Sequence, residues 1–251
     1  MTLTATACLG QSFTLSDQAL LGQGQVVNTV VSNAQVLGAI AWYKGSVGVF
    51  RDYGTNSATN TQQIFQWNDQ SGFSNNLVTV DTNLNPILIT NGINGFPVVR
   101  FIDNPDTTFL IASNLTNQQL VIAMMVMEYD DHTAGGGGFE MFNSAFGSFI
   151  LDEDAFNRIA LDSGTTLVSP IPLPGSVYNY ITLVFNGISS SIRQNGVTVN
   201  TGNVPNGIST TAFYLESCQS YNRSFAEVIL STNLATIPLT EAYFTNKYNI
   251  H

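Results

Sequence analysis

The sequence has 251 residues, of which 44% are hydrophobic and only 10% are charged, so it holds enough apolar surface to exclude a disordered chain. Seven Lys and Arg residues stand against seventeen Asp and Glu residues, which gives a net charge of -10. This balance argues against nucleic acid and anionic membrane as partners, because both attract clustered cations.

The first 36 residues differ from the rest in carrying a single charge, Asp17. Thr alternates with Leu or Ala over residues 2–7, a period of two that predicts a β-strand. We expect residues 1–36 to form either extra edge strands on their own domain or an arm that adds a strand to a neighbouring subunit. Residues 37–251 then form one β domain, for which the length is ordinary.

The N-terminus, the apolar runs and the cysteines give little information about function. No basic segment precedes an apolar run at the N-terminus, so we expect no secretory signal peptide. The longest apolar run, Leu120–Met127, has the length of a strand, so we expect no membrane insertion. Cys8 and Cys218 are the two cysteines of the sequence, and either two buried thiols or one disulfide fits them.

The first stretch with a strong pattern lies between residues 38 and 72. Gly38–Tyr43 is β-branched and aromatic and predicts a strand, with Trp42 in the core because its neighbours are apolar. Gln66–Gly72 then predicts a short strand that ends in a turn of Asn, Asp, Ser and Gly. We expect Asp69 to accept hydrogen bonds from the backbone of its own turn rather than to bind a ligand.

Four Asn-Gly pairs predict hairpin turns, because Asn and Gly tolerate the positive φ angles that tight hairpins need. They are Asn91-Gly92, Asn94-Gly95, Asn186-Gly187 and Asn195-Gly196. The run at residues 180–185 before the third pair alternates between two faces and predicts a strand. Antiparallel strand pairs joined by these turns are therefore expected.

The middle of the chain contains two unusual runs. Leu120–Met127 is apolar without alternation, which predicts a strand in the middle of a sheet with both faces covered. Ala134–Gly138 contains four consecutive glycines, for which we expect a flexible hairpin tip rather than a strand. No Lys-Ser or Lys-Thr follows these glycines, so a phosphate-binding loop is excluded.

The C-terminal stretch predicts a strand followed by a helix. Phe225–Leu230 reads as a last long strand. Ile237–Tyr248 reads as a short helix with Pro238 in its first turn and Thr236 as the N-cap. Lys247 sits favourably at the C-terminal end of that helix.

Three stretches of this chain resemble, in order and spacing, the laminin-G-like and concanavalin A-like lectin-glucanase domains of bacteria and phages. They are the Trp67–Gly72 turn with the strand Pro97–Phe101, the strand pair Tyr180–Val197, and the ending Phe225–Ile250. The resemblance implies an all-β fold, an antiparallel two-sheet jelly-roll β-sandwich of the concanavalin A-like type with a short C-terminal helix.

The same resemblance raises the question of catalysis. Glycosidases with this fold carry paired carboxylates on one strand, one as acid and one as nucleophile or base. Asp152-Glu153-Asp154 is the acidic cluster closest to that pattern, but its order differs and a third carboxylate is missing. We expect a solvated acidic turn there and no enzyme activity. His132 and His251 belong to no recognisable hydrolase constellation, and zinc-ligand spacing is absent.

Binding residues are expected on loops. Calcium is held by loop carboxylates in several members of the resembling family, and Asp103 and Asp106 are the candidates here, with Asp130 and Asp131 as a second pair. No other cofactor is expected. A sugar site needs an exposed aromatic ring beside amide or carboxylate groups. The loop aromatics that meet this description are Tyr53, Phe73, Tyr178 and Tyr221, together with Tyr129.

The function expected from these observations is attachment without catalysis. The first hypothesis is a virion structural protein, capsid-decorating or tail-associated, at the particle surface. Its partners would be other virion subunits, further copies of itself or a host-surface glycan. The alternative is a free-standing glycan-binding adhesin, extracellular or on a cell surface. A glycoside hydrolase or lyase is the third hypothesis, and it would use the acidic cluster at residues 152–154.

Overall fold

The computed structural model describes most of the chain. The described residues are 3–6, 12–15, 38–79, 85–102, 108–113, 115, 120–129, 137–144, 147–153, 158–162, 165–204, 212–217 and 222–251. The chain forms two units, Met1–Ala34 and Gln35–His251. In the first unit, β1 (Leu3–Thr6) pairs antiparallel with β2 (Ser12–Leu15). Whether this unit serves as an arm stays a prediction.

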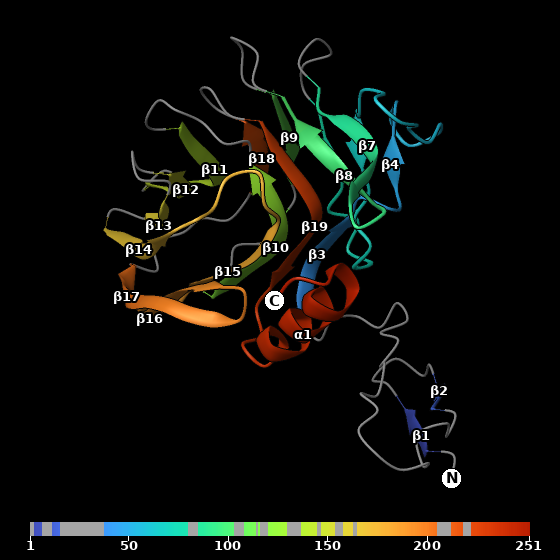
Figure 1. The fold of residues 1–251 in the computed structure, drawn as a ribbon. Coiled ribbons are helices and arrows are strands. Elements are labelled where there is room, and N and C mark those ends of the chain that lie inside the picture. Colours follow the sequence, from blue (N-terminus) through green and yellow to red (C-terminus); the bar gives the residue numbers. More distant parts are fainter. Residues whose placement is uncertain are drawn as a thin grey trace. The chain divides into compact units, whose positions relative to one another are not determined.

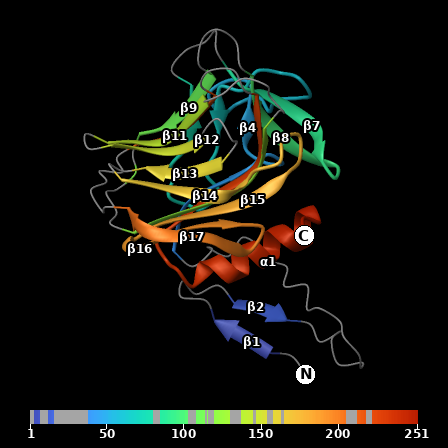
Figure 2. The same ribbon diagram turned by 60° about the vertical axis from the view of Figure 1, so that its left-hand side comes forward.

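The second unit is an antiparallel β-sandwich with one helix among its described residues (Figures 1 and 2). One sheet has eight described strands, in the order β17 (Val197–Val204), β16 (Gly187–Gln194), β15 (Asn179–Phe185), β10 (Val121–Tyr129), β19 (Arg223–Ser231), β8 (Phe96–Phe101) and β7 (Ile87–Ile93), with β3 (Ala39–Lys44) also paired to β19. The predicted two-sheet fold is confirmed.

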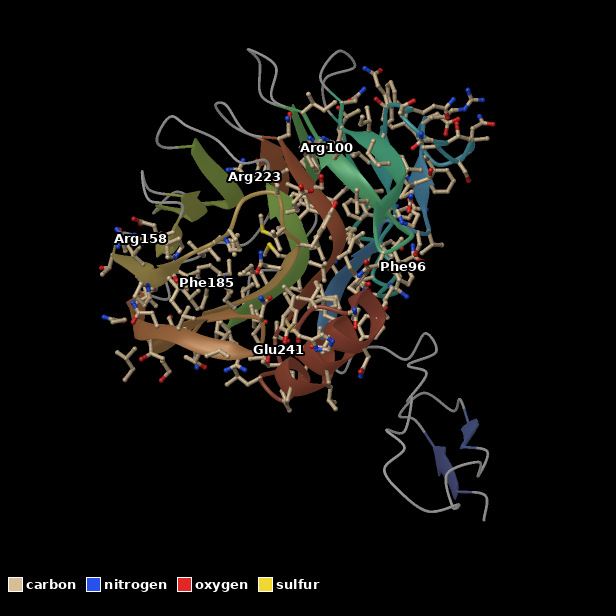
Figure 3. The ribbon with its side chains drawn as sticks, in the orientation of Figure 1. Phe96, Arg100, Arg158, Phe185, Arg223 and Glu241 are labelled. Carbon is tan, nitrogen blue, oxygen red and sulfur yellow. The ribbon has the colours of Figure 1, made fainter. Side chains whose placement is uncertain are left out.

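The other sheet has nine described strands. Their order is β14 (Thr166–Pro172), β13 (Arg158–Asp162), β12 (Gly147–Glu153), β11 (Gly137–Ser144), β18 (Phe213–Ser217), β9 (Thr108–Ala112), β6 (Leu77–Val78), β5 (Gln66–Trp67) and β4 (Val49–Phe50). The main core fills the space between the two sheets, where Phe185 points inward from β15 (Figure 3). Tyr43 stacks there on Phe213 at 6.0 Å between ring centroids.

The strand β10 shows why its sequence lacks alternation. Its odd-numbered residues, from Val121 to Met127, belong to the core between the sheets. Ile122, Met124 and Val126 belong to a second cluster on the outer face of the eight-stranded sheet. Each is fully buried, because β15 and β19 flank the strand and each of its faces is covered. The prediction of a central strand is confirmed.

The second cluster is completed by α1 (Thr236–Tyr248), which packs Phe244 and Tyr248 against the outer face of the eight-stranded sheet. Pro238 lies in its first turn as predicted. The prediction of Thr236 as N-cap is wrong. Ala235 occupies that position without a side-chain cap, and the Thr236 hydroxyl instead donates to the Asn233 carbonyl at 2.7 Å.

Within the described chain, no helix is long and apolar enough to cross a membrane.

Three of the four predicted Asn-Gly turns are confirmed. Asn94-Gly95 joins β7 to β8 with φ of 48° and 85°, and Asn195-Gly196 joins β16 to β17 with φ of 46° and 80°. Asn186 lies between β15 and β16, and Gly187, with a φ of 56°, is the first residue of β16. The prediction of a turn at Asn91-Gly92 is wrong, because both residues belong to β7. A Cβ at position 92 would stand 2.5 Å from Val98, so glycine is needed there for close packing.

The glycine run requires a second correction. Gly137 and Gly138 belong to β11, where they pair with Glu153 and Asp152 of β12. The backbone hydrogen bonds of a hairpin therefore outweigh the entropy that glycine loses in a strand. Residues 130–136, the rest of the predicted hairpin tip, lie outside the described residues.

Candidate functional site

A groove of about 410 Å³ opens on the second unit at the C-terminal end of α1. Three segments far apart in the sequence form it: the β7–β8 turn, the loop before β15 with the β16–β17 turn, and the residues that follow α1. The lining residues are Ile93, Asn94, Ser176, Val177, Tyr178, Asn179, Asn195, Tyr248, Asn249, Ile250 and His251. Among these described residues there is no Lys, Arg, Asp or Glu.

One wall of the groove is built by the β7–β8 turn and the end of the helix. The Asn94 side-chain amide donates to the Tyr248 carbonyl oxygen at 2.5 Å, which ties the turn to the last helical residue. The Phe96 ring packs edge-on against Tyr248 at 5.2 Å between centroids. Asn249 then ends the helix in the left-handed conformation, with φ of 53°. The tight hairpin turn thus places an asparagine at the groove.

The opposite wall is held by a pair of asparagines. Asn195 of the β16–β17 turn donates its amide to the side-chain oxygen of Asn179 at 2.9 Å. Its own side-chain oxygen accepts from the Tyr180 backbone at 3.0 Å. Asn179 donates in turn to the Val177 carbonyl at 3.0 Å. This chain of amides fixes the loop before β15, so Val177 and Tyr178 are presented at defined positions.

Tyr178 is the aromatic side chain that this loop contributes. It is half-buried, and its hydroxyl is hydrogen-bonded to Glu128 and to Ser224 on the sheet below. Burial, and then the negative charge of Glu128, raise the pKa of Tyr178 well above its ordinary value. Because the hydroxyl is already engaged, the surface that Tyr178 offers to a ligand is the carbon surface of its ring.

The structure does not bring the predicted glycan-binding residues together. Tyr178 lines the groove, whereas Tyr53 and Phe73 are 62% and 63% exposed on other loops. Tyr53 contacts Phe65 edge-on at 6.0 Å. Tyr221 lies outside the described residues, and Tyr129 is described by its backbone alone. A sugar-binding role for any of them stays a prediction.

The predicted metal and catalytic residues fall mostly outside the described part of the chain. These are Asp103, Asp106, Asp130, Asp131, His132 and Asp154, together with Cys8 and Cys218. Asp152 is described only as a backbone position in β12. Within the described residues, no group of three or more His, Cys, Asp or Glu could hold a metal ion. The calcium and catalysis predictions therefore stay untested.

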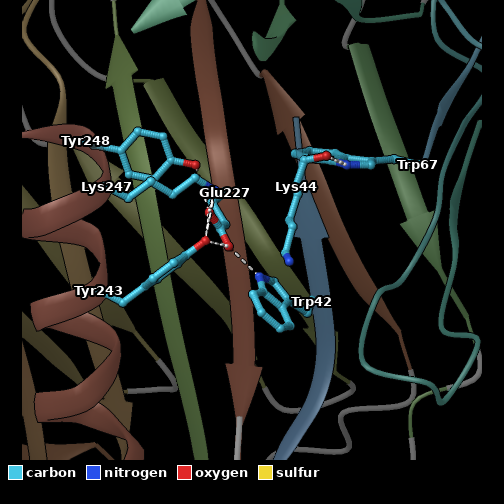
Figure 4. A network of polar contacts seen from close by, with 7 residues as sticks. All are labelled: Trp42, Lys44, Trp67, Glu227, Tyr243, Lys247 and Tyr248. Carbon is cyan, nitrogen blue, oxygen red and sulfur yellow. Dashed lines mark hydrogen bonds and ion pairs between the residues drawn. The ribbon is translucent and has the colours of Figure 1, made fainter. Parts of the chain in front are cut away.

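Sequence reasoning missed a buried carboxylate, Glu227 of β19, which is 0% exposed. Figure 4 shows the side chains that converge on it, from β3 and α1. Its oxygens accept hydrogen bonds from Trp42 Nε1 at 2.5 Å, Lys247 Nζ at 2.7 Å, the Tyr248 hydroxyl at 2.7 Å and the Tyr243 hydroxyl at 3.2 Å. The available signal was a single acid within the otherwise apolar run Phe225–Leu230.

Two lysines lie beside this carboxylate. Lys247 is ion-paired with it, and Lys44 places its Nζ 3.6 Å from the centroid of the Trp42 ring. Burial lowers the pKa of Lys44, and the charge of Glu227 opposes that shift. The carboxylate of Glu227 is closed off from solvent and already accepts several donors. It therefore fastens α1 to the sheet rather than offering a reactive group.

A second carboxylate, Glu241, fastens the helix from the other side. Arg193 of β16 binds it through two parallel hydrogen bonds of 2.8 Å, and the Thr182 hydroxyl donates to it at 2.9 Å. The hydrogen bond to Glu241 raises the pKa of Arg193. Figure 3 shows Glu241 on the helix, facing the sheet. The two carboxylates together set the position of the groove wall that follows the helix.

Asp69 has the role predicted for it. Its side-chain oxygens accept from the backbone N–H groups of Trp42 and Ser71 at 2.8 Å and of Asn75 at 3.0 Å. The Ser71 hydroxyl donates to it at 2.7 Å. The carboxylate therefore organises the loop after β5 and attaches it to β3. The prediction that Trp42 belongs to the core is also confirmed, since it is buried in the second cluster, where its ring contacts Tyr243 of α1 edge-on at 6.4 Å.

Solved structures with a similar fold exist, although the sequence matches no known protein-family model and no curated protein sequence. The sialidase of Trypanosoma rangeli in complex with sialic acid is similar with a TM-score of 0.54 at 11% identity, over 83% of this chain and 33% of that one. The binding domain of botulinum neurotoxin DC in complex with SialylT is similar with a TM-score of 0.55 at 12% identity, over 86% and 52%.

A third structure, described as HCR/D-Sa-GBL1/C, has a TM-score of 0.58 at 13% identity, over 84% of this chain and 53% of its own. The present chain thus spans between a third and about half of the chains it resembles. At such low identity the likeness shows a shared β-sandwich fold and nothing about the site.

Proposed function

We propose that residues 35–251 form a non-enzymatic, lectin-like domain that binds a glycan in the groove beside Tyr178. The observation that carries the proposal is the lining itself. An aromatic ring with an engaged hydroxyl stands in a concave site beside Asn94, Asn195 and Asn249, while the buried Asn179 holds the loop in place. Rings pack on the apolar faces of sugars, and amides both donate to and accept from sugar hydroxyls. Such a mixture of ring surface and few polar groups is typical of small-ligand sites.

Two further observations support binding rather than catalysis. Glu227 and Glu241, the buried carboxylates described above, are saturated by hydrogen bonds and ion pairs beneath α1. Neither lines the groove. The comparison structures support ligand binding by analogy only, since a toxin binding domain and a sialidase, each solved with a ligand, share the sandwich fold, and they do not distinguish binding from catalysis.

A glycan array followed by titration of the best binder tests the proposal. Changing Tyr178→Ala removes the ring and should weaken binding about tenfold, which corresponds to about 1.4 kcal/mol. Tyr178→Phe keeps the ring and should retain most of the affinity. Phe73→Ala is the control, because it removes an exposed aromatic side chain outside the groove. Silence across the array, or equal loss in the Phe73 variant, would refute the groove as the site.

The finer assignments rest on the sequence. We keep as proposals the membership in the laminin-G-like, concanavalin A-like family and the role as a virion subunit that assembles with itself or with other virion proteins. The motifs from Trp67 to Ile250 support the first, and the low charge supports packing among subunits. Mass spectrometry of purified particles tests the second: the chain should be present in stoichiometric amounts, and its absence would remove the virion role.

A further inference from the structure

The charges around the groove are arranged in a way that bears on which glycans can enter it. Tyr178 stands at the groove with Glu128 hydrogen-bonded behind its hydroxyl, and the negative charge of Glu128 acts on that hydroxyl more strongly than the opposing charge of Arg100. The ligand-facing groups themselves are amides, a hydroxyl, an imidazole and apolar carbon. The chain as a whole adds a net charge of -10.

The cations near the groove walls have partners within the protein. Arg100 of β8, whose charge acts on Tyr178, donates to the Ser224 hydroxyl at 3.4 Å. Lys247, next to the lining residue Tyr248, bonds to Glu227 at 2.7 Å and its side chain is only 17% exposed. Arg193, next to the β16–β17 turn, is held by Glu241 through two hydrogen bonds. Moving either cation to a ligand would leave a carboxylate buried without its partner, which is costly.

We propose that the groove selects uncharged glycans and discriminates against the same glycans when they carry a carboxylate or sulfate. This inference rests on the proposed glycan-binding function. An anionic sugar in this site would lose hydration without gaining a Lys or Arg counter-charge from the lining residues, on a chain whose net charge is -10. The fold is shared with structures solved with sialic acid and with SialylT, so the selectivity would come from the groove rather than from the fold.

Matched glycan pairs test the proposal. Each pair contains one oligosaccharide with and without a terminal sialic acid, titrated against the full chain at low and at physiological salt. The neutral member should bind at least about tenfold more tightly, and raising the salt should narrow the difference because it screens the repulsion. A sialylated member that binds equally or better would overturn the selectivity while leaving glycan binding intact. If neither member binds, while the wider array is also silent, the proposed function itself fails.

A gain-of-function variant makes the test independent of lost folding. Val177 is 50% exposed at the groove, and it holds Asn179 through its backbone carbonyl, so its side chain can change without disturbing that bond. Val177→Lys should raise affinity for the sialylated member about fivefold or more, whereas the uncharged control Val177→Gln should not. No gain in the Lys variant, with neutral binding retained, would contradict an electrostatic origin of the selectivity.

Discussion

The contact between α1 and the sheet and the groove beyond the helix differ in how they use polar side chains. Beneath α1, charged groups meet close counterparts: Glu227 bonds Lys247 at 2.7 Å, and Glu241 bonds Arg193 at 2.8 Å. In the groove just beyond the helix, the lining residues are amides, aromatic and aliphatic groups, with an imidazole and a hydroxyl. The comparison shows that charged side chains hold α1 on the sheet, whereas uncharged polar and apolar side chains line the solvent-accessible groove.

The physical reason lies in desolvation. A carboxylate removed from water is tolerated only with partners that satisfy its charge and its lone pairs, and such a site is then closed to ligands. The free-energy cost of removing an amide from water is much smaller than that of removing a charged group. Amides therefore suit a surface that exchanges water for a ligand. Breaking the fastenings should therefore affect stability, whereas altering the groove should affect binding.

The largest effect is expected from Glu227→Gln. The substitution removes the charge and leaves Lys247 without its ion-pair partner. The new amide N–H groups also face the N–H and O–H donors of Trp42 and the tyrosines, with which they cannot form hydrogen bonds. The free energy of unfolding should fall by about 3–5 kcal/mol. Urea unfolding measures it, with Leu239→Ala as control because that side chain on the same helix is 69% exposed. A loss below about 1 kcal/mol would show that the carboxylate does not fasten the helix.

High pH should loosen the same network. Burial, followed by the negative charge of Glu227, raises the pKa of the Tyr243 and Tyr248 hydroxyls. Outside this network, burial and then the charge of Asp69 raise the pKa of Tyr43. Below the ordinary tyrosine pKa of about 10 these three hydroxyls are neutral in both states, so their contribution is fully present. Above it the unfolded chain ionises first, and stability falls by about 1.4 kcal/mol per pH unit for each such group.

This alkaline effect is measured by urea unfolding at increasing pH together with tyrosinate absorbance. Tyrosinate should appear late, along with unfolding, and the Tyr243→Phe variant should show a shallower decline. Flat stability between pH 9 and about 11 would contradict the account, because the unfolded tyrosines ionise in that window.

The Arg193–Glu241 ion pair should contribute less to the free energy of unfolding than the Glu227 network, because 23% of the Arg193 side chain is exposed. A double-mutant cycle with Arg193→Met and Glu241→Gln should give a coupling energy of about 1–2 kcal/mol. The coupling should shrink only slightly in high salt, since Glu241 is buried. A coupling near zero would mean that the Arg193–Glu241 pair does not help to hold the helix.

Much of the fold was predictable because its signals are local. The Asn94-Gly95 and Asn195-Gly196 turns follow from positive φ, and the doubly buried β10 follows from an apolar run of strand length. The false turn at Asn91-Gly92 shows the limit. The same dipeptide sits in β7 there, because the facing Val98 requires a residue without a Cβ.

The candidate site was less predictable because its parts meet only in the folded chain. Nothing near Tyr178 in the sequence says that its loop will face the Asn94 turn and the residues after α1, whereas Tyr53 and Phe73 will not. The partners of Glu227 likewise come from β3 and from α1. A lone acid in an apolar strand signals a buried network but does not identify its members.

The most direct test of the central claim is an NMR titration of the chain labelled at its tyrosine rings, with a neutral glycan selected from the array. Tyr178 is assigned from the Tyr178→Phe variant and Tyr53 from Tyr53→Phe. The account predicts that the ring signals of Tyr178 shift with ligand concentration while those of Tyr53 stay in place. Shifts at Tyr53 with an unmoved Tyr178 would contradict it.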